Sequence, residues 1–289
     1  MTALAIEGRS PTQLALRRFR KNRRAMISFW LLLAVGLSTL IIPLVSPHDF
    51  RTQKLELQKQ APNGTYWMGT DPNGRDLLVR TFIGGRVSFA VGLLATGISL
   101  LIGVAYGATA GFLGHRVDTV MMRFVDVLYG LPTMFLVIIV MAVLGRSFLV
   151  VFMVLGCFSW MTMSRIVRGQ VLSLKEKEFV EAARALGVAT PAIIARHMIP
   201  NILGPVIVYS TLTVPSVMLQ EAFLSFLGLG ISEPATSWGL LIADGASALN
   251  PLRVYWWLVV FPGFQLAITL FCLNAVGDGL RDAFDVQQK

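Results

Sequence analysis

One acidic side chain stands inside a long apolar run, and its type and position make it the residue of this chain most suited to a chemical role. Glu221 lies more than halfway through the apolar segment 202–227. A carboxylate at such a depth is costly in hydrocarbon, so it usually faces a bundle interior or a wet cavity and marks a functional site. The alternative is a neutral or hydrogen-bonded structural glutamate near the membrane surface, because Gly228 and Gly230 soon end the run. The sequence leaves both interpretations open.

Other residue types that support catalysis or metal binding are scattered. His48, His115 and His197 fall in three separate polar segments, so the sequence predicts no metal site and no proton relay. Cys157 and Cys272 lie in apolar runs, where each is expected to pack as a small hydrophobic side chain. The chain has no G-x-x-x-x-G-K-[ST], H-E-x-x-H or G-x-S-x-G sequence. We therefore expect no catalytic residue and no ATP site of the usual kind.

A polar segment between two apolar runs, residues 173–200, has the pattern of two short helices joined by a tight turn. Ser173 and Glu176 have the spacing of a capping box, and strong helix formers follow. Gly187 can adopt the left-handed conformation that ends a helix. These signals predict that the first helix ends at this glycine.

The second half of that segment carries its own start and stop signals. Thr190 can cap a second helix, Pro191 suits its first turn, and Pro200 is expected to end it. Small side chains give the first helix a shallow face with charged edges; they are Ala182, Ala183 and Ala185. Such a helix pair is suited to being gripped by another protein, and the alternative is an ordinary cytoplasmic loop.

The composition is that of a membrane protein. Of the 289 residues 55% are hydrophobic and 14% are charged, and the mean hydropathy is +0.67. A soluble domain carries roughly a quarter charged residues. The net charge of +9 comes largely from a cluster just before the first apolar run, at residues 17, 18, 20, 21, 23 and 24. Basic residues in that position favour an anchor on anionic membrane lipid over nucleic-acid binding.

Apolar runs long enough to cross a bilayer predict an all-α polytopic protein with six transmembrane helices. The runs are 26–45, 87–113, 126–144, 147–163, 202–227 and 254–276. Pro132 is expected to kink the third helix. In the second run, small residues recur every four positions at Gly103, Gly107 and Gly111, a spacing that favours close packing against another helix.

The distribution of Lys and Arg sets the orientation. Seventeen lie on the side of both termini and of segment 173–200, and eight lie on the other side. Because the richer side is normally cytoplasmic, both termini and the helix pair are expected inside. The predicted organisation is a basic cytoplasmic arm (1–25), the first transmembrane helix (26–45), a periplasmic segment (46–86), a five-helix core (87–277) that contains the loop 173–200, and a cytoplasmic tail (278–289).

The helix-pair segment resembles a known family. Its residues Glu181, Ala182, Ala183 and Gly187, followed by Ile199 and Pro200, are similar to the EAA loop of ABC importer permeases. In that family the loop docks into a groove of the ATP-binding subunit. His197 stands where the family usually has isoleucine. The resemblance implies that these residues, together with Ala185, couple the chain to an ATPase.

A narrower resemblance extends over nearly the whole chain. Its segments are GTDPNGRDLLVR at 69–80, VDTVMMRFVDVL at 117–128, EAFLSFLGLG at 221–230, SWG at 237–239 and GDGLRDAFD at 277–285. They are similar to the C-type permeases of the dipeptide, oligopeptide and nickel subfamily, and the segments at 7–10 and 165–179 are especially similar to oligopeptide permeases.

This resemblance implies a type I ABC importer permease fold in a bacterial cytoplasmic (inner) membrane. It also implies a second, homologous permease as heterodimer partner, two ATP-binding subunits and a periplasmic or lipoprotein substrate-binding protein that delivers peptide. ATP and Mg²⁺ would belong to the ATPases, so this chain would be non-catalytic and bind no cofactor. Glu221 becomes a candidate for the translocation pathway.

Three other functions remain open at this stage. The same architecture could import nickel or another small solute. A channel or secondary transporter working alone would favour ion pairs within the membrane and an inverted repeat, and neither is clear in the sequence. A membrane scaffold without transport would not need the helix-pair loop.

Overall fold

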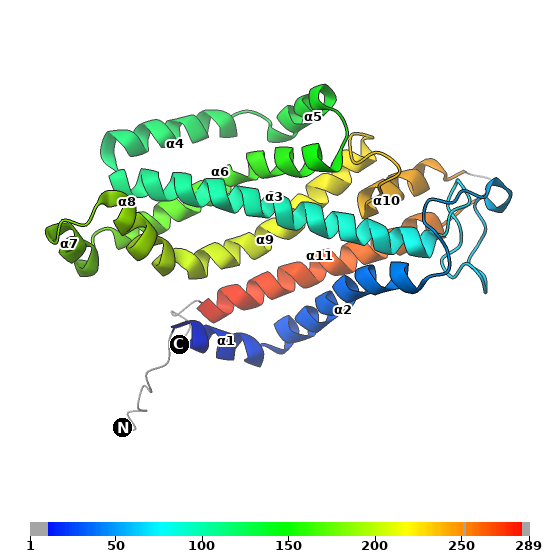
Figure 1. Cartoon of the computed structure of the whole chain (residues 1–289), viewed down its shortest axis with the longest axis horizontal. Coiled ribbons are helices and arrows are strands. Elements are labelled where there is room, and N and C mark those ends of the chain that lie inside the picture. The colour runs from blue at the N-terminus through cyan, green and yellow to red at the C-terminus, as the bar shows by residue number, and fades with distance from the viewer. Residues whose placement is uncertain (1–10, 251–252, 285–289) are drawn as a thin grey trace.

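The computed structural model describes residues 11–250 and 253–284. Long helices lie side by side in one bundle, with α4 and α5 on one flank and α1 and α2 on the other (Figure 1). In chain order the elements are α1 (Pro11–Lys21), α2 (Arg23–Val45), η1 (Leu55–Leu57), α3 (Leu77–Leu113), α4 (His115–Tyr129), α5 (Thr133–Leu144), α6 (Phe148–Leu174), α7 (Glu178–Ala185), α8 (Thr190–Ile193), the π-helical turn η2 (Ile194–Met198), α9 (Ile199–Phe226), α10 (Trp238–Ser247) and α11 (Trp257–Phe284).

The spans agree with the six that the sequence predicts. Five helical segments in the described ranges are long and apolar enough to cross a membrane, and a sixth span results if α4 and α5 are counted together. These two helices meet at a bend of 78°. Pro132 immediately precedes α5 and has no backbone N–H to donate to a helical hydrogen bond. The expected kink is therefore a break between two helices.

α3 begins ten residues before the predicted start at residue 87. The Asp76 carboxylate accepts from the backbone N–H of Leu78 at 2.9 Å and caps the helix. Its 37 residues span about 55 Å at 1.5 Å per residue, which exceeds the roughly 30 Å of a hydrocarbon core. The helix therefore begins within the segment 46–86, whose assignment to the periplasmic side stays a prediction. The charged residues in this part of the chain led the sequence analysis to place it outside the span. One of them, Arg86, donates to two carbonyls of α2, Thr39 O and Leu40 O.

Two other helix ends differ from the prediction. α6 continues to Leu174, well past residue 163, and Ser164, Val167 and Val171 of this extension are buried. Pro200 does not end a helix: it lies in the first turn of α9, where its missing N–H breaks no hydrogen bond. α10 was not predicted at all, since it lies in the outer loop that the sequence assigns to residues 228–253.

The glycine stripe of α3 lies at the contact with α6. A Cβ at Gly107 would lie 2.2 Å from Ser164 O, and one at Gly103 would lie 2.6 Å from the Met163 Cβ. At Gly111 the nearest atom would be Arg168 O at 2.9 Å. α3 and α6 are thus packed backbone against backbone along their length, as small residues at every fourth position allow.

Candidate functional site

The polar segment after α6 forms a compact helix pair at one end of the bundle (Figure 1). α7 ends in two hydrogen bonds: Val188 N–H donates to Ala183 O at 3.1 Å, and Gly187 N–H donates to Arg184 O at 3.0 Å. Gly187 has φ +74°. This is the Schellman arrangement, which requires a left-handed residue. The predicted capping box is absent, because the Ser173 hydroxyl donates to Gln170 O and α7 begins only at Glu178.

One face of the helix pair is fixed to the transmembrane bundle. Val180, Ile193 and Met198 are buried in a cluster that includes Val167 and Val171 of α6. Ala183, which the resemblance assigns to the ATPase contact, also lies in this cluster and is 6% exposed. Its place on the inner face corrects the expectation that all three alanines form one docking surface.

The opposite face of the helix pair is open. Ala182, Ala185 and Glu181 are exposed on α7, and Leu186 at its tip is 83% exposed. Toward the start of α9, His197 and Ile199 are partly buried and Pro200 is exposed. We call the exposed residues of α7 and its tip the loop surface; they are Glu178, Phe179, Glu181, Ala182, Arg184, Ala185 and Leu186. Exposed apolar side chains on a surface with charged edges, here Phe179 and Leu186, are a feature of protein-interaction sites.

A cavity of about 490 Å³ lies between the broken span, α6 and α9. α9 contributes a polar stripe at helical spacing, which consists of Tyr209, Thr213, Ser216 and Gln220. The rest of the lining is mixed polar, aromatic and aliphatic: Tyr129, Thr133, Met134, Phe158, Ser159, Met161, Thr162, Met163, Ile166 and Leu212. Such a lining offers hydroxyl and amide partners without a formal charge. The sequence analysis missed this stripe, although its spacing within residues 202–227 was visible.

A small polar network lies at the α4 end of this cavity. The hydroxyls of Tyr129 and Thr162 are hydrogen-bonded. Arg165 lies over the Tyr129 ring, with its guanidinium carbon 4.1 Å from the centroid. Its Nη2 also donates to Asp126 Oδ1 at 2.7 Å. These contacts fasten the last turn of α4 to α6.

Glu221 lies outside the set of residues that line this cavity. Its side chain is 1% exposed. Its Oε1 accepts from the hydroxyls of Ser225 and Ser237, both at 2.7 Å, and Ser237 also caps α10 by accepting from Leu240 N–H. This geometry matches the hydrogen-bonded structural alternative and ties α9 to α10. The pathway role of Glu221 stays a prediction.

A buried charge network closes the end of the bundle opposite the helix pair. Asp71 Oδ2 accepts from Arg75 Nε at 2.7 Å and also from Arg80. Arg75 Nη2 donates to Glu233 Oε1 at 2.6 Å, and this hydrogen bond lowers the pKa of the Glu233 carboxyl. Arg80 is 1% exposed. The GTDPNGRDLLVR segment is thereby held to the loop that follows α9.

The SWG segment is packed into the same end. Trp238 is fully buried, and its indole Nε1–H donates to Thr81 O at 2.8 Å. Its backbone N–H donates to Ser88 Oγ at 3.1 Å. A Cβ at Gly85 would lie 2.7 Å from the indole ring, so glycine is needed there. Sequence segments that are far apart in the chain thus form one packed end of the bundle, which we call the outer cap after its predicted side of the membrane.

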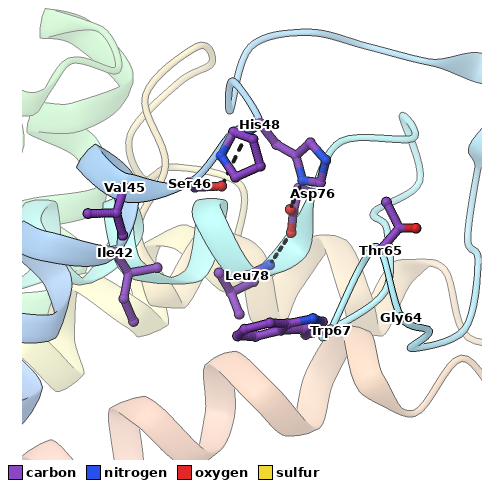
Figure 2. Close-up of a pocket in the computed structure, with 10 residues that line it drawn as sticks. Ile42, Val45, Ser46, His48, Gly64, Thr65, Trp67, Asp76 and Leu78 are labelled. Carbon is purple, nitrogen blue, oxygen red and sulfur yellow. Dashed lines mark hydrogen bonds and ion pairs between the residues drawn. The ribbon is translucent and has the colours of Figure 1, made fainter.

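Figure 2 shows a second pocket at this end, of about 530 Å³, where α2 ends beside the start of α3. The Nδ1 atom of His48 lies 2.6 Å from Asp76 Oδ2, and its ring stacks on Tyr66 at 4.9 Å between centroids. Trp67 is 73% exposed, whereas Tyr66 is 7% exposed and packs against the His48 ring. His48 is therefore a structural partner of Asp76, the residue that caps α3.

The fold is that of an ABC importer permease. A chain of the MetNI methionine ABC transporter, solved in inward-facing conformations, superposes with a TM-score of 0.54 at 15% identity, over 69% of this chain and 94% of that chain. A sequence model of the family described as "Binding-protein-dependent transport system inner membrane component" matches residues 66–287. The chain belongs to this family, whose members are multi-pass proteins of the inner membrane.

Individual relatives match over almost the full chain. The oligopeptide transport system permease protein OppC of Haemophilus influenzae is 46% identical over 288 residues, which cover 99% of this chain and 92% of the relative. The OppC protein of Escherichia coli K12 is 47% identical over 99% and 94%. The dipeptide transport system permease protein DppC of Bacillus subtilis is 44% identical over 96% and 86%. Residues 10–62 match a model of the N-terminal transmembrane domain of oligopeptide transport permease C.

Proposed function

We propose that this chain is one of two membrane subunits of an ATP-driven importer that moves di- and oligopeptides into the cell. The proposal rests on the relatives named above and, within this chain, on one observation: the rigid helix pair with its exposed loop surface is continuous with α9, which lines the neutral polar cavity. A force applied to the helix pair is transmitted directly to the cavity wall, as alternating access requires.

The cavity lining supports peptide as substrate. Peptides share a backbone of N–H and C=O groups but differ in side chains and charge. Hydroxyl and amide groups such as Thr213, Ser216 and Gln220 can donate to or accept from any peptide backbone. A wall without a formal charge binds no single peptide tightly, and a transporter needs substrate to leave as well as enter.

The partners in this proposal are a homologous permease, which completes the pathway on the open side of the cavity, two ATPase subunits on the loop surface, and a periplasmic or lipoprotein substrate-binding protein at the outer cap. ATP and Mg²⁺ are bound by the ATPases, and this chain holds no cofactor and performs no hydrolysis. The excess of Lys and Arg at the end that carries the helix pair supports a cytoplasmic location for both termini.

Uptake in proteoliposomes that contain the complete complex tests the substrate class. A labelled peptide delivered with the binding protein is expected to accumulate only with internal ATP, and unlabelled peptides of different sequence are expected to compete with it. Competition by nickel ions, with none by peptides, would contradict the proposal and favour the metal-importing alternative.

A further inference from the structure

A separate cavity of about 570 Å³ lies on the opposite flank of the bundle, where α2 begins and α11 ends. In Figure 1 this region lies beside α1, at the C-terminal end of α11. Its walls carry one basic side chain, Arg24, and two acidic ones, Asp278 and Asp282. Ile27 and Phe271 line the apolar part. The acidic residues belong to the GDGLRDAFD segment, to which the proposed transport function assigns no role.

The back wall of this cavity is a close contact between two helices. A Cβ at Gly279 would lie 2.3 Å from the Cβ of Ala25 and 3.3 Å from the Phe19 ring. Phe19 and Ala25 are both buried with Val276 and Ala283 of α11. α1, α2 and α11 are therefore packed against one another at this level, and the cavity lies beside this contact.

The charged side chains around the cavity do not neutralise one another. Asp278 and Asp282 are one helical turn apart, so both lie on the same face of α11 and repel each other. Across the described part of the chain, no nitrogen–oxygen contact within 4.0 Å joins either of them to Arg24. All three side chains are exposed. The arrangement therefore presents a place for a cation between two carboxylates, beside a place for an anion.

The apolar side chains extend the cavity in one direction only. Ile27 is 68% exposed and Phe271 is 67% exposed, and each lies one or two turns deeper in its helix than the charged residues. The charged residues thus lie where α2 and α11 leave the apolar layer, at the level of lipid headgroups. Polar groups above and open apolar surface below match the two parts of a phospholipid.

We propose that this cavity binds a phospholipid of the cytoplasmic leaflet whose headgroup carries a phosphate and a primary ammonium, that is, an ethanolamine phospholipid; the choice of leaflet rests on the orientation proposed above. Arg24 binds the phosphate, Asp278 and Asp282 share the ammonium, and an acyl chain lies along Ile27 and Phe271. A glycerol headgroup offers the two carboxylates no cation. A choline headgroup offers a cation without N–H donors, so it forms no charge-assisted hydrogen bonds.

Lipid binding to the complete purified complex tests this proposal without any transport measurement, so its outcome is independent of the substrate class. The delipidated complex is titrated with ethanolamine, choline and glycerol phospholipids of identical acyl chains, and bound lipid is counted by native mass spectrometry. Wild type is expected to retain the ethanolamine lipid about tenfold better than the other two. Equal retention of the three headgroups would overturn the proposal.

Variants locate the binding. The double change Asp278→Asn with Asp282→Asn is expected to abolish the preference for ethanolamine over choline, and Arg24→Gln is expected to weaken retention of both lipids. Arg23→Gln is the matched control, since residue 23 does not line the cavity, and it should behave as wild type. An unchanged headgroup preference in the double variant would contradict the assignment, as would an equal loss in the control.

A cross-linking experiment tests the proposal even if the charge variants fail to assemble. A benzophenone amino acid in place of Phe271, which is exposed, is expected to give an adduct with ethanolamine phospholipid when the complex is irradiated in mixed-lipid nanodiscs. An adduct with another protein subunit would show that the cavity is a subunit contact, and it would overturn the lipid assignment.

Discussion

The guanidinium carbon of Arg165 lies 4.1 Å from the centre of the Tyr129 ring, and the two residues belong to different helices at one end of the polar cavity. Tyr129 is the last residue of α4, directly before the break that separates it from α5. Arg165 also pairs with Asp126. The half-helix α4 is thereby held to α6, and a movement that widens this end of the cavity must break the contact or carry both helices together.

Arg165→Met removes the ion pair and the cation–π contact but leaves an apolar side chain of similar length. Both partners of the ion pair are more than a third exposed, so assembly of the complex is expected to change little. We expect less peptide transported per ATP hydrolysed, because α4 no longer moves with α6. Uptake and ATP hydrolysis measured in the same proteoliposomes check this. Arg146→Met, outside the cavity lining, is the control, and an unchanged ratio for Arg165→Met would show that the contact has no part in coupling.

Substitutions at Glu221 separate its two interpretations. Glu221→Gln keeps an acceptor for Ser225 and Ser237, so a structural residue predicts nearly normal uptake per assembled complex. Glu221→Leu leaves both hydroxyls without this partner, at a cost of about 1–3 kcal/mol for each buried group, and is expected to reduce the amount of complex. Loss of uptake in Glu221→Gln, with assembly intact, would instead support the pathway role.

Substitution of Gly187, which has a left-handed backbone conformation, is expected to act through the backbone alone. No heavy atom lies within 4 Å of a Cβ built at this position, so a side chain meets no obstacle. Gly187→Val nevertheless forces a β-branched residue to φ +74°, at about 1–2 kcal/mol. Peptide-stimulated ATP hydrolysis is expected to fall, whereas Gly187→Asn, which tolerates this conformation better, should retain most of it. Equal activity of the two variants would contradict this account of the turn.

The outer cap is expected to weaken in acid. The hydrogen bond from Arg75 lowers the pKa of Glu233 below its ordinary value of 4.5. The contribution of ionised Glu233 to stability is therefore complete at pH values above its ordinary pKa. It is lost as the pH falls from there through the lowered pKa. Thermal unfolding of the complex across this pH window should show a loss that Glu233→Gln lacks. The same acid dependence in the variant would assign the loss to other groups.

The sequence predicted the spans well because each is a continuous apolar run, and it predicted the end of α7 because Gly187 stands alone after a run of helix formers. It did not predict the first ten residues of α3. The charge of Arg80 made this part of the chain resemble a loop. In the folded chain Arg80 is buried against Asp71, which supplies its ion-pair partner.

Other features of the site depend on tertiary contacts that periodicity does not encode. Ala182 and Ala183 are equivalent in type, and only the packing of α7 against α6 and α9 decides that the second is buried. The partners of Glu221 come from α9 and from the N-terminus of α10, a helix that the sequence analysis did not find. The stripe from Tyr209 to Gln220 was visible in the sequence, but its meaning depended on the cavity beside it.

The central claim is that peptide import is driven through the loop surface, and Leu186 gives the most direct test. Its side chain is 83% exposed and makes no contribution to the buried cluster, so Leu186→Glu should leave this chain folded in the membrane. Proteoliposomes that contain the complete complex, internal ATP and labelled peptide are compared for wild type and Leu186→Glu, with uptake expressed per molecule of this chain. The account predicts ATP-dependent uptake in wild type and its loss, together with loss of bound ATPase, in the variant. Full uptake by Leu186→Glu, or wild-type uptake that needs no ATP, would contradict it.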